Sequence, residues 1–432
     1  MGASHSTPAG AKHVVVVGGS FGGLEAAKRA HAAGLRVTVI EPKDRFSTVF
    51  GGVRAMVVPA FEDSMLFPYD KVFPAGSSSK FVRGWATGVD PAARTITYQP
   101  LDASARPSGP PTALQYDYLI LALGCSNTVE WHGQHSQAEY KALLAATRAA
   151  IAAAPSVLVV GAGAVGIELC GEIRDHHPAK PVTLATGGEV LSNDAAAVPK
   201  FRAAITAEIA AAGIALRAGV RPNVRELEGR PDIVSLSPGV FAARTPGATF
   251  AVSLAPSSPP VEVGLVIATT GSRPLTAWLK EGPLGSALDA AGYIRVGRTY
   301  QVQGQDSVFA IGDCTATAGG EGKGVFRAED QAGIAAGNAA ALARGAGRGA
   351  LALGPDFAKQ APFMSVPVGR SHGMAQMPGL CDKNLVSFVA GFKAKQYLVD
   401  IFAGKVKYTV AEGIAANSRV PVAVAVDIAV SK

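Results

Sequence analysis

The stretch His13-Val-Val-Val-Val17, followed by Gly18-Gly-Ser-Phe-Gly-Gly23, decides the fold expected for this chain. A continuous apolar run is typical of a strand buried on both faces of a parallel sheet. The glycine-rich turn leads into a segment of helical composition, 24–33, and a second apolar run at 36–40 predicts the next strand. Strand, glycine turn, helix and strand together predict a βαβ unit that binds a dinucleotide.

A second unit of the same kind begins at Ser156-Val-Leu-Val-Val160. Its turn is Gly161-Ala-Gly-Ala-Val-Gly166, its helix is expected over 167–175, and its second strand over 182–185. The two turns lie too far apart for a solenoid repeat, so they predict two separate dinucleotide-binding domains. Further buried strands are expected within 116–124, 263–271 and 308–314.

Composition excludes several classes of protein. The chain has 432 residues, a formal net charge of +7, 48% hydrophobic and 17% charged residues, which excludes a disordered chain and a coiled coil. Lys and Arg are scattered, so nucleic-acid binding is not expected. The four cysteines form no CxxC or CxxxxC pair, which excludes a disulfide scaffold, a sequence-local metal site and a redox dithiol. No uninterrupted apolar stretch reaches the length of a transmembrane helix.

In the first turn, Gly18 permits the tight turn and Gly23 permits close packing of helix on strand. Ser20 stands where the middle glycine of the fingerprint usually lets a pyrophosphate approach the helix N-terminus. Glu41 ends the second strand, where an acid hydrogen-bonds adenosine ribose hydroxyls. These features together predict a dinucleotide site.

The second fingerprint, Gly161, Gly163 and Gly166, is complete, but its acid is missing. The corresponding strand end is Ala185-Thr-Gly187. Without a carboxylate, a 2′-phosphate is not excluded, and no Arg stands in this stretch to attract one. The choice between NADH and NADPH therefore stays open.

Two acidic residues have alternative interpretations. Glu168, in the first turns of the second unit's helix, either complements the helix dipole or holds a nicotinamide carboxamide. Asp313 follows a buried strand and either caps the next turn or contacts a ligand at the carboxyl edge of the sheet.

The motifs GGSFGG with Glu41, YDYLILALG, GAGAVGIELCGEI, ATTGSRP and VFAIGDC occur in an order that resembles the pyridine nucleotide-disulfide oxidoreductase superfamily over residues 13 to about 345. Without a redox cysteine pair, the chain resembles NADH:quinone-type members. Phe46, the run Gly52-Val-Arg-Ala55, the MGxxxS start and the short C-terminal region with Gly391-Phe392 are similar to the apoptosis-inducing-factor-like branch that contains ferroptosis suppressor protein.

The resemblance implies an α/β fold with two doubly wound Rossmann-like domains and a small α+β C-terminal domain. The FAD-binding domain is expected over 12–135 and 276–350, split by an NAD(P)H-binding domain over 155–275. Residues 356–432 are expected to form the C-terminal domain for an interface or for membrane docking.

The resemblance also implies site residues. Lys323 and Glu168 are the expected catalytic residues, and no metal is expected. Arg54 and Lys323 would lie near the flavin, although both could be ordinary surface cations. The expected cofactor-binding residues are Gly18, Gly19, Ser20, Phe21, Gly22, Gly23, Glu41, Arg54, Gly124, Gly161, Gly163, Gly166, Glu168, Gly271, Gly312 and Asp313.

The N-terminus, Met1-Gly-Ala-Ser-His-Ser6, matches the N-myristoylation motif at Gly2. One acyl chain binds membranes weakly, so a second signal is needed. Lysines at 393, 395, 405 and 407, interleaved with aromatic residues, could supply it, or they could be ordinary lysines of a folded domain.

We therefore expect an FAD-dependent oxidoreductase that takes hydride from NADH or NADPH and reduces a quinone-type lipid such as ubiquinone. The expected location is the cytoplasm, peripheral on the plasma membrane, lipid droplets or the mitochondrial outer surface, and a homodimer is compatible with the resemblance. The alternatives are a flavin reductase of a protein acceptor and an NAD(P)H-sensing, apoptosis-inducing-factor-like binding protein.

Overall fold

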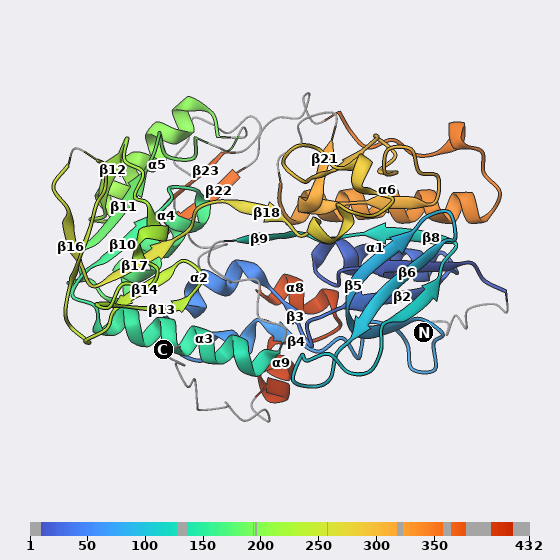
Figure 1. Cartoon of the computed structure of the whole chain (residues 1–432), viewed down its shortest axis with the longest axis horizontal. Coiled ribbons are helices and arrows are strands. Elements are labelled where there is room, and N and C mark those ends of the chain that lie inside the picture. The colour runs from blue at the N-terminus through green and yellow to red at the C-terminus, as the bar shows by residue number, and fades with distance from the viewer. Residues whose placement is uncertain are drawn as a thin grey trace. The chain divides into compact units, whose positions relative to one another are not determined.

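The computed structural model describes residues 10–127, 136–192, 194, 197–256, 258–317, 323–356, 364–376 and 399–417. The chain divides into two units (Figure 1). The first comprises Met1–Phe46, Pro68–Ser126 and Ser272–Gln360, and the second comprises Ser47–Phe67, Asn127–Gly271 and Ala361–Lys432. Gly2 and the lysines at 393 and 395 lie outside the described residues. No described helix is both long and apolar enough to cross a membrane.

The first unit is built on a seven-stranded sheet. Its order is β20 (Val308–Ala310), β8 (Tyr118–Leu121), β1 (His13–Val17), β2 (Arg36–Glu41), β5 (Lys80–Asp90), β6 (Thr95–Pro100) and β7 (Thr112–Gln115). The strands from β20 to β5 are parallel, whereas β6 and β7 add antiparallel pairs. The valines of β1 are almost completely buried, as expected for a strand covered on both faces.

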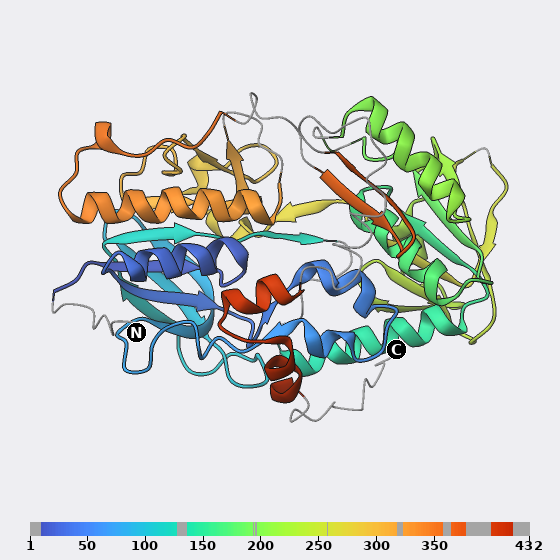
Figure 2. The same cartoon turned by 180° about the vertical axis from the view of Figure 1, so that it is seen from behind.

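Helices α1 (Phe21–Ala32) and α6 (Val325–Ala343) pack side by side in this unit (Figure 2). Their close approach depends on small residues, since a Cβ on Gly22 would lie 3.3 Å from the Cβ of Ala328. The remaining short strands form two pairs: β9 (Cys125–Asn127) with β18 (Ser272–Pro274), and β19 (Ile294–Val296) with β21 (Thr315–Thr317).

The second unit is built on a six-stranded sheet. Its order is β12 (Ala215–Ala218), β11 (Val182–Thr186), β10 (Val157–Val160), β17 (Leu265–Ala268), β14 (Val240–Ala243) and β13 (Ile233–Ser237). The strands from β12 to β17 are parallel, and β14 and β13 pair antiparallel. A separate pair, β15 (Phe250–Val252) and β16 (Val261–Val263), adds Phe250 and Val263 to the core beside this sheet.

Helices α3 (Gln137–Ala153), α4 (Ala164–His176) and α5 (Pro199–Ala211) accompany this sheet. The hairpin of β22 (Met364–Val368) and β23 (His372–Gln376) packs against α4 and α5 (Figure 1). Its close contact with α4 requires Gly171, because a Cβ there would collide with the backbone of Val368. The described C-terminal elements, including α8 (Val399–Lys405) and α9 (Val410–Asn417), thus belong to the second unit.

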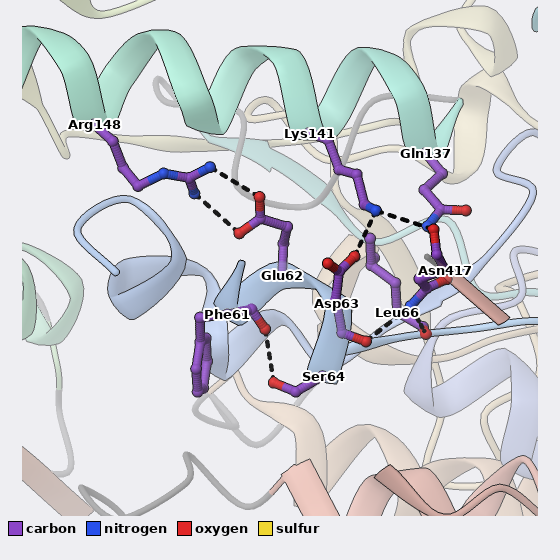
Figure 3. A network of polar contacts seen from close by, with 9 residues as sticks. All are labelled: Phe61, Glu62, Asp63, Ser64, Leu66, Gln137, Lys141, Arg148 and Asn417. Carbon is purple, nitrogen blue, oxygen red and sulfur yellow. Dashed lines mark hydrogen bonds and ion pairs between the residues drawn. The ribbon is translucent and has the colours of Figure 1, made fainter. Parts of the chain in front are cut away.

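Residues 47–67 also belong to the second unit. Within or beside this segment lie β3 (Phe46–Ser47), η1 (Val49–Gly51), α2 (Gly52–Ala55), η2 (Phe61–Ser64) and β4 (Leu66–Phe67). Two ion pairs join η2 to α3: Glu62 with Arg148 at 2.8 Å and Asp63 with Lys141 at 2.5 Å (Figure 3). These partners are distant in sequence, so composition alone gives no sign of the pairing.

Asn417 joins α9 to the same cluster (Figure 3). Its side-chain amide donates to the backbone carbonyls of Asp63 and Leu66, both at 2.8 Å, and its side-chain oxygen accepts from Gln137 at 2.7 Å. Asn417 is fully buried, so each of these bonds replaces one that water would otherwise provide.

The two sheets confirm the α/β prediction of two Rossmann-like domains. The boundaries expected from the sequence stay a prediction. By its contacts, the segment 47–67, expected within the FAD-binding stretch 12–135, groups with residues 127–271 instead.

Candidate functional site

The first glycine turn follows β1 in the first unit and has a backbone that requires glycine. Gly18 has a φ of 102°, and a Cβ there would collide with the carbonyl oxygen of Ala122. A Cβ on Gly23 would collide with the carbonyl oxygen of Gly18. The turn is therefore tight, and it delivers the chain directly into α1.

Ser20 is the residue before α1 and has φ −81°, which any residue can adopt. This explains why serine is tolerated where the fingerprint usually has glycine. Its side chain makes no capping hydrogen bond to the helix. The first N–H groups of α1 lack intrahelical partners, and such a helix end attracts a phosphate.

Glu41 lies beside this turn, as the sequence predicts. It is buried, accepts a hydrogen bond from the backbone N–H of Gly19, and accepts another from the N–H of Lys43 at 2.9 Å. The ammonium of Lys43 lies 3.9 Å from the same carboxylate. Tyr69 donates to the carbonyl of Gly19 at 3.1 Å, so it holds the turn from another side. Lys43 and Tyr69 were not predicted, because no motif distinguishes them.

Gly312, Asp313 and Lys323 are brought together after β20 in the first unit. The carboxylate of Asp313 accepts a hydrogen bond from the N–H of Gly324, the residue before α6, at 3.2 Å. The ammonium of Lys323 donates to the carbonyls of Asp313 at 2.6 Å and Thr315 at 3.2 Å. The amide of Gly312, with φ 75°, donates to buried Gln331 at 2.6 Å.

Lys323 also lies over the ring of Tyr293, 3.5 Å from its centroid. Loss of hydration lowers the pKa of Lys323, and the carboxylate of Asp313 opposes that shift. Its ammonium is therefore held in one place by backbone carbonyls and an aromatic face, as a positioned cation rather than a freely moving surface lysine.

The cysteines of the first unit are neutral thiols at pH 7. Burial raises the pKa of Cys125 to about 12 and that of Cys314 to about 11, and the Asp313 carboxylate contributes to both shifts. The thiol of Cys125 points at Asp313, with 3.8 Å between sulfur and oxygen. Because the thiolate is the nucleophile, these two residues are unreactive in thiol chemistry.

The second glycine turn follows β10 in the second unit. Gly161 has φ 116°, and Thr269 donates to its carbonyl at 2.8 Å. A Cβ on Gly166 would collide with that carbonyl. Gly163 precedes α4, and no described atom lies within 4 Å of the position that its Cβ would take. That open position leaves room for a pyrophosphate at the helix N-terminus.

Glu168 and Glu172 lie one turn apart on α4, and both are buried. Glu172 accepts two hydrogen bonds from the guanidinium of Arg54, at 2.8 and 3.0 Å. Arg54 lies on α2 and is also buried, with its guanidinium 5.7 Å from the ring centroid of Phe61. This bidentate pair joins the segment 47–67 to the helix that follows the second glycine turn.

Both turns fit a dinucleotide. Each places an uncapped or glycine-capped helix N-terminus after a buried parallel strand, and the first adds a buried carboxylate at the end of the second strand. Gly124 and Gly271, with φ 67° and 71°, have open space where a side chain would project, among the described atoms.

Comparison with known families now identifies the fold. The model of the pyridine nucleotide-disulphide oxidoreductases matches residues 10–341. The chain belongs to this family. It is accordingly an oxidoreductase, and the expected cofactors, FAD and NADH or NADPH, are confirmed as those of the family.

Two relatives illustrate the similarity within the family. Apoptosis-inducing factor homolog B of Dictyostelium discoideum is 28% identical over 406 residues, which cover 90% of this chain and 95% of that protein. Ferroptosis suppressor protein 1 of Homo sapiens is 27% identical over 316 residues, which cover 73% of this chain and 77% of that protein. The sequence predicted a similarity to apoptosis-inducing factor and ferroptosis suppressor protein, and these relatives confirm it.

Among solved structures, the sulfide:quinone oxidoreductase of Aquifex aeolicus superposes with a TM-score of 0.61 at 18% identity. The superposition covers 93% of this chain and 92% of that one. At this identity it shows that the fold is shared.

The structure places the predicted site residues in two groups. In the first unit lie Gly18, Gly19, Ser20, Phe21, Gly22, Gly23, Glu41, Gly124, Gly312, Asp313 and Lys323. In the second unit lie Arg54, Gly161, Gly163, Gly166, Glu168 and Gly271. Phe21 and Gly22 are buried in packing, Phe21 against Phe46 at 5.2 Å between ring centroids. The roles of all these residues in binding a cofactor stay predictions.

Proposed function

We propose that this protein is an FAD-dependent NAD(P)H oxidoreductase whose electron acceptor is a quinone-type lipid. The family assignment and the similarity to ferroptosis suppressor protein 1 support the reaction class. FAD, when bound, supplies the centre that takes hydride from NAD(P)H and gives electrons to the acceptor.

The observation that carries the proposal is the state of the cysteines beside Asp313. Cys125 and Cys314 hold their protons at neutral pH, since burial raises the pKa of both. A disulfide reductase would pass electrons through a reactive thiolate. Neutral, separate thiols favour direct transfer to an acceptor outside the protein, and a quinone accepts two electrons in this way.

In the first unit, the residues of the chain bind and orient the flavin nucleotide in this proposal. The α1 N-terminus attracts the pyrophosphate, and Glu41 accepts hydrogen bonds from ribose hydroxyls. Asp313, fixed by Gly324, contacts the ribityl chain. Lys323, fixed on two carbonyls, presents positive charge near the flavin.

In the second unit, the turn from Gly161 to Gly166 holds the pyrophosphate of NAD(P)H, and Glu168 holds the nicotinamide carboxamide. The Arg54–Glu172 pair keeps α4 and α2 together, so that Arg54 acts here as a positioning residue. Its contact with the flavin, which the resemblance implies, stays part of the proposal.

Access to a lipid acceptor requires a membrane surface. Gly2 is the proposed myristoylation site, and α8 and α9 are the proposed second contact. Ile401 is 50% and Ile414 is 44% exposed, and Lys407 is exposed beside them in sequence. Tyr408, by contrast, is buried and faces Phe67, so it packs the fold rather than a membrane.

The experiment compares Gly2→Ala with wild type in fractionated cells and in two quinone assays. Ser4→Ala is the matched control, because position 4 of the motif is unrestricted. We expect Gly2→Ala to leave the membrane fraction, to oxidise NAD(P)H normally with a short-chain quinone, and to lose at least tenfold with a long-chain quinone held in vesicles.

Loss of both activities together, or retention of Gly2→Ala on the membrane, contradicts the proposed delivery to a lipid quinone. If wild type turns over no quinone, the acceptor is wrong. Turnover only with an added protein acceptor would then identify a flavin reductase of a protein, and salt-sensitive DNA binding without turnover would identify a sensor.

A further inference from the structure

The end of β11 is where an adenosine ribose is recognised in a dinucleotide-binding domain. In the first unit Val17 pairs with Ile40, and the next residue is Glu41. In the second unit Val160 pairs with Ala185, and the next residue is Thr186. Thr186 therefore occupies the position of the acid, and no carboxylate at this position repels a 2′-phosphate.

The side chain of Arg221 packs against Gly187, the residue that follows Thr186. A Cβ on Gly187 would lie 2.5 Å from the Cγ and 2.9 Å from the Cδ of Arg221, and it would also collide with Nε. The backbone positions this arginine, because the N–H of Val220 donates to the carbonyl of Thr186 at 3.0 Å. The absence of a side chain at Gly187 thus creates the space that Arg221 fills.

The guanidinium of Arg221 is available to a ligand. Arg221 is exposed, and it makes no hydrogen bond or ion pair within the described part of the chain. Arg221 is distant in sequence from the second glycine turn, which is why the stretch 185–187 gave no sign of an arginine.

The next acidic residue in the sequence after this strand forms an ion pair with an arginine. Glu189 is highly exposed, and its carboxylate lies 3.5 Å from the guanidinium of Arg202 on α5. The second guanidinium nitrogen of Arg202 donates to the carbonyl of Asp194 at 3.4 Å, which holds this arginine near the loop after β11. One paired carboxylate and an arginine that has no partner among the described residues leave the strand end positively charged.

We propose that Arg221 binds the 2′-phosphate of NADPH and makes this protein prefer NADPH to NADH. The inference rests on the proposed function, which places a nicotinamide nucleotide at the second glycine turn. An arginine forms charge-assisted, often bidentate hydrogen bonds with phosphate. NADH lacks the phosphate and gains nothing from Arg221.

The test measures binding of two redox-inactive fragments to the FAD-loaded protein by titration calorimetry: 2′-phospho-ADP-ribose and ADP-ribose. Wild type should bind the phosphorylated fragment about 10- to 100-fold more tightly, the usual range for a charged hydrogen bond at such a site. Arg221→Ala should lose this difference and keep its affinity for ADP-ribose. Arg225→Ala, an exposed arginine in η3 (Val224–Leu227), is the matched control and should behave as wild type.

Gly187→Asp provides a second variant, because it places a carboxylate at the strand end and displaces Arg221. It should weaken binding of the phosphorylated fragment by at least tenfold, with a smaller effect on ADP-ribose. The preference of wild type should also decrease as salt is added.

Equal affinities in wild type, or equal losses for both fragments in Arg221→Ala, overturn the inference. If NADH and NADPH still reduce the flavin in that case, the proposed function stands. If neither fragment binds and neither nucleotide reduces the flavin, the inference and the proposed function both fail.

Discussion

At the scale of single residues, equivalent positions in the two glycine turns carry different side chains. Ser20 in the first turn corresponds to Gly163 in the second, and Glu41 corresponds to Thr186. Ser20 has a φ open to any residue, so the substitution costs no backbone strain. The strand-end residues differ in charge, which separates a site suited to ribose hydroxyls from the one at which we propose a ribose phosphate.

Replacing Glu41 with Gln should weaken FAD binding about 10- to 100-fold. The amide keeps the shape of the side chain but loses the negative charge that accepts hydrogen bonds from Gly19 and Lys43. The measurement is the ratio of flavin to protein after dilution and gel filtration. Glu25→Gln, on α1 and paired with Arg29 near the surface, is the matched control. Equal flavin content in the Glu41 and Glu25 variants would show that Glu41 does not contact the cofactor.

We expect Glu168 to act in flavin reduction and Glu172 to stabilise the fold. Glu168→Gln should slow reduction of the flavin by NADPH by about tenfold or more, because a misplaced nicotinamide reacts poorly. Glu172→Gln should lower the free energy of unfolding by about 3–5 kcal/mol, because it breaks a buried pair and leaves Arg54 without its carboxylate. Stopped-flow reduction and urea unfolding of both variants test this. A Glu168 variant with wild-type kinetics would assign that residue to the helix dipole.

At the scale of helices and strands, the repeated βαβ pattern could be predicted because apolar runs and glycines are local signals. The expected strand at 13–17 is β1, and the strands expected at 156–160 and 182–185 differ from β10 and β11 by one residue. The place of the segment 47–67 could not be predicted. Its position depends on partners such as Arg148, Lys141 and Glu172, whose charges resemble any others in the sequence.

In the candidate site too, local sequence signals could be predicted and long-range contacts could not. Gly18 and Glu41 could be predicted because their spacing is typical of one βαβ unit, and Gly161 because it begins the same kind of turn in a second unit. Arg221 could not be predicted in this way, because its side chain reaches the strand end through the fold rather than through the local sequence. The residues that we propose to select between NADH and NADPH could therefore be found only in the structure.

Asn417 should be essential for attachment of α9. Asn417→Ala leaves the carbonyls of Asp63 and Leu66 and the amide of Gln137 without this partner in a buried place. We expect a loss of about 2–4 kcal/mol in the free energy of unfolding. Ile414→Ala, exposed on the same helix, should cost about 0.5 kcal/mol or less. Chemical denaturation compares the two, and a similar stability for both variants would exclude a role for the Asn417 cluster.

The pairing of β1 and β2 should depend on pH through His13. His13 is buried; one ring nitrogen lies 2.8 Å from the carbonyl of Gln115 and the other 2.9 Å from the hydroxyl of Thr38. Burial lowers the pKa of His13 below 6.5, with a contribution from Arg36. The unfolded chain then binds the proton more readily, so stability is complete above pH 6.5 and decreases as the pH falls toward the folded pKa.

Thermal unfolding of wild type and His13→Gln between pH 7 and pH 5 tests this dependence. The variant has no group that titrates at position 13, so its stability should decrease less over this range than that of wild type. Parallel curves for the two proteins would show that folding does not lower the pKa of His13 and would contradict this prediction.

At the scale of the whole molecule, the family model covers residues 10–341, a range that contains both glycine turns and all strands of the two large sheets. The described C-terminal elements add a hairpin against α4 and α5 and a helix tied by Asn417. They reinforce the second unit, while α8 and α9 also expose Ile401 and Ile414. The C-terminal region thus combines a structural role with the surface proposed to meet a membrane.

The most direct test of the proposed function is the visible absorption spectrum of the purified protein, recorded without oxygen during titration with NADPH and then with a quinone. We predict the bands of one oxidised FAD per chain, their loss on addition of one equivalent of NADPH, and their return on addition of the quinone. A colourless protein that cannot be loaded with FAD, or flavin bands that neither NADPH nor NADH bleaches, would show that this protein is not an FAD-dependent NAD(P)H oxidoreductase.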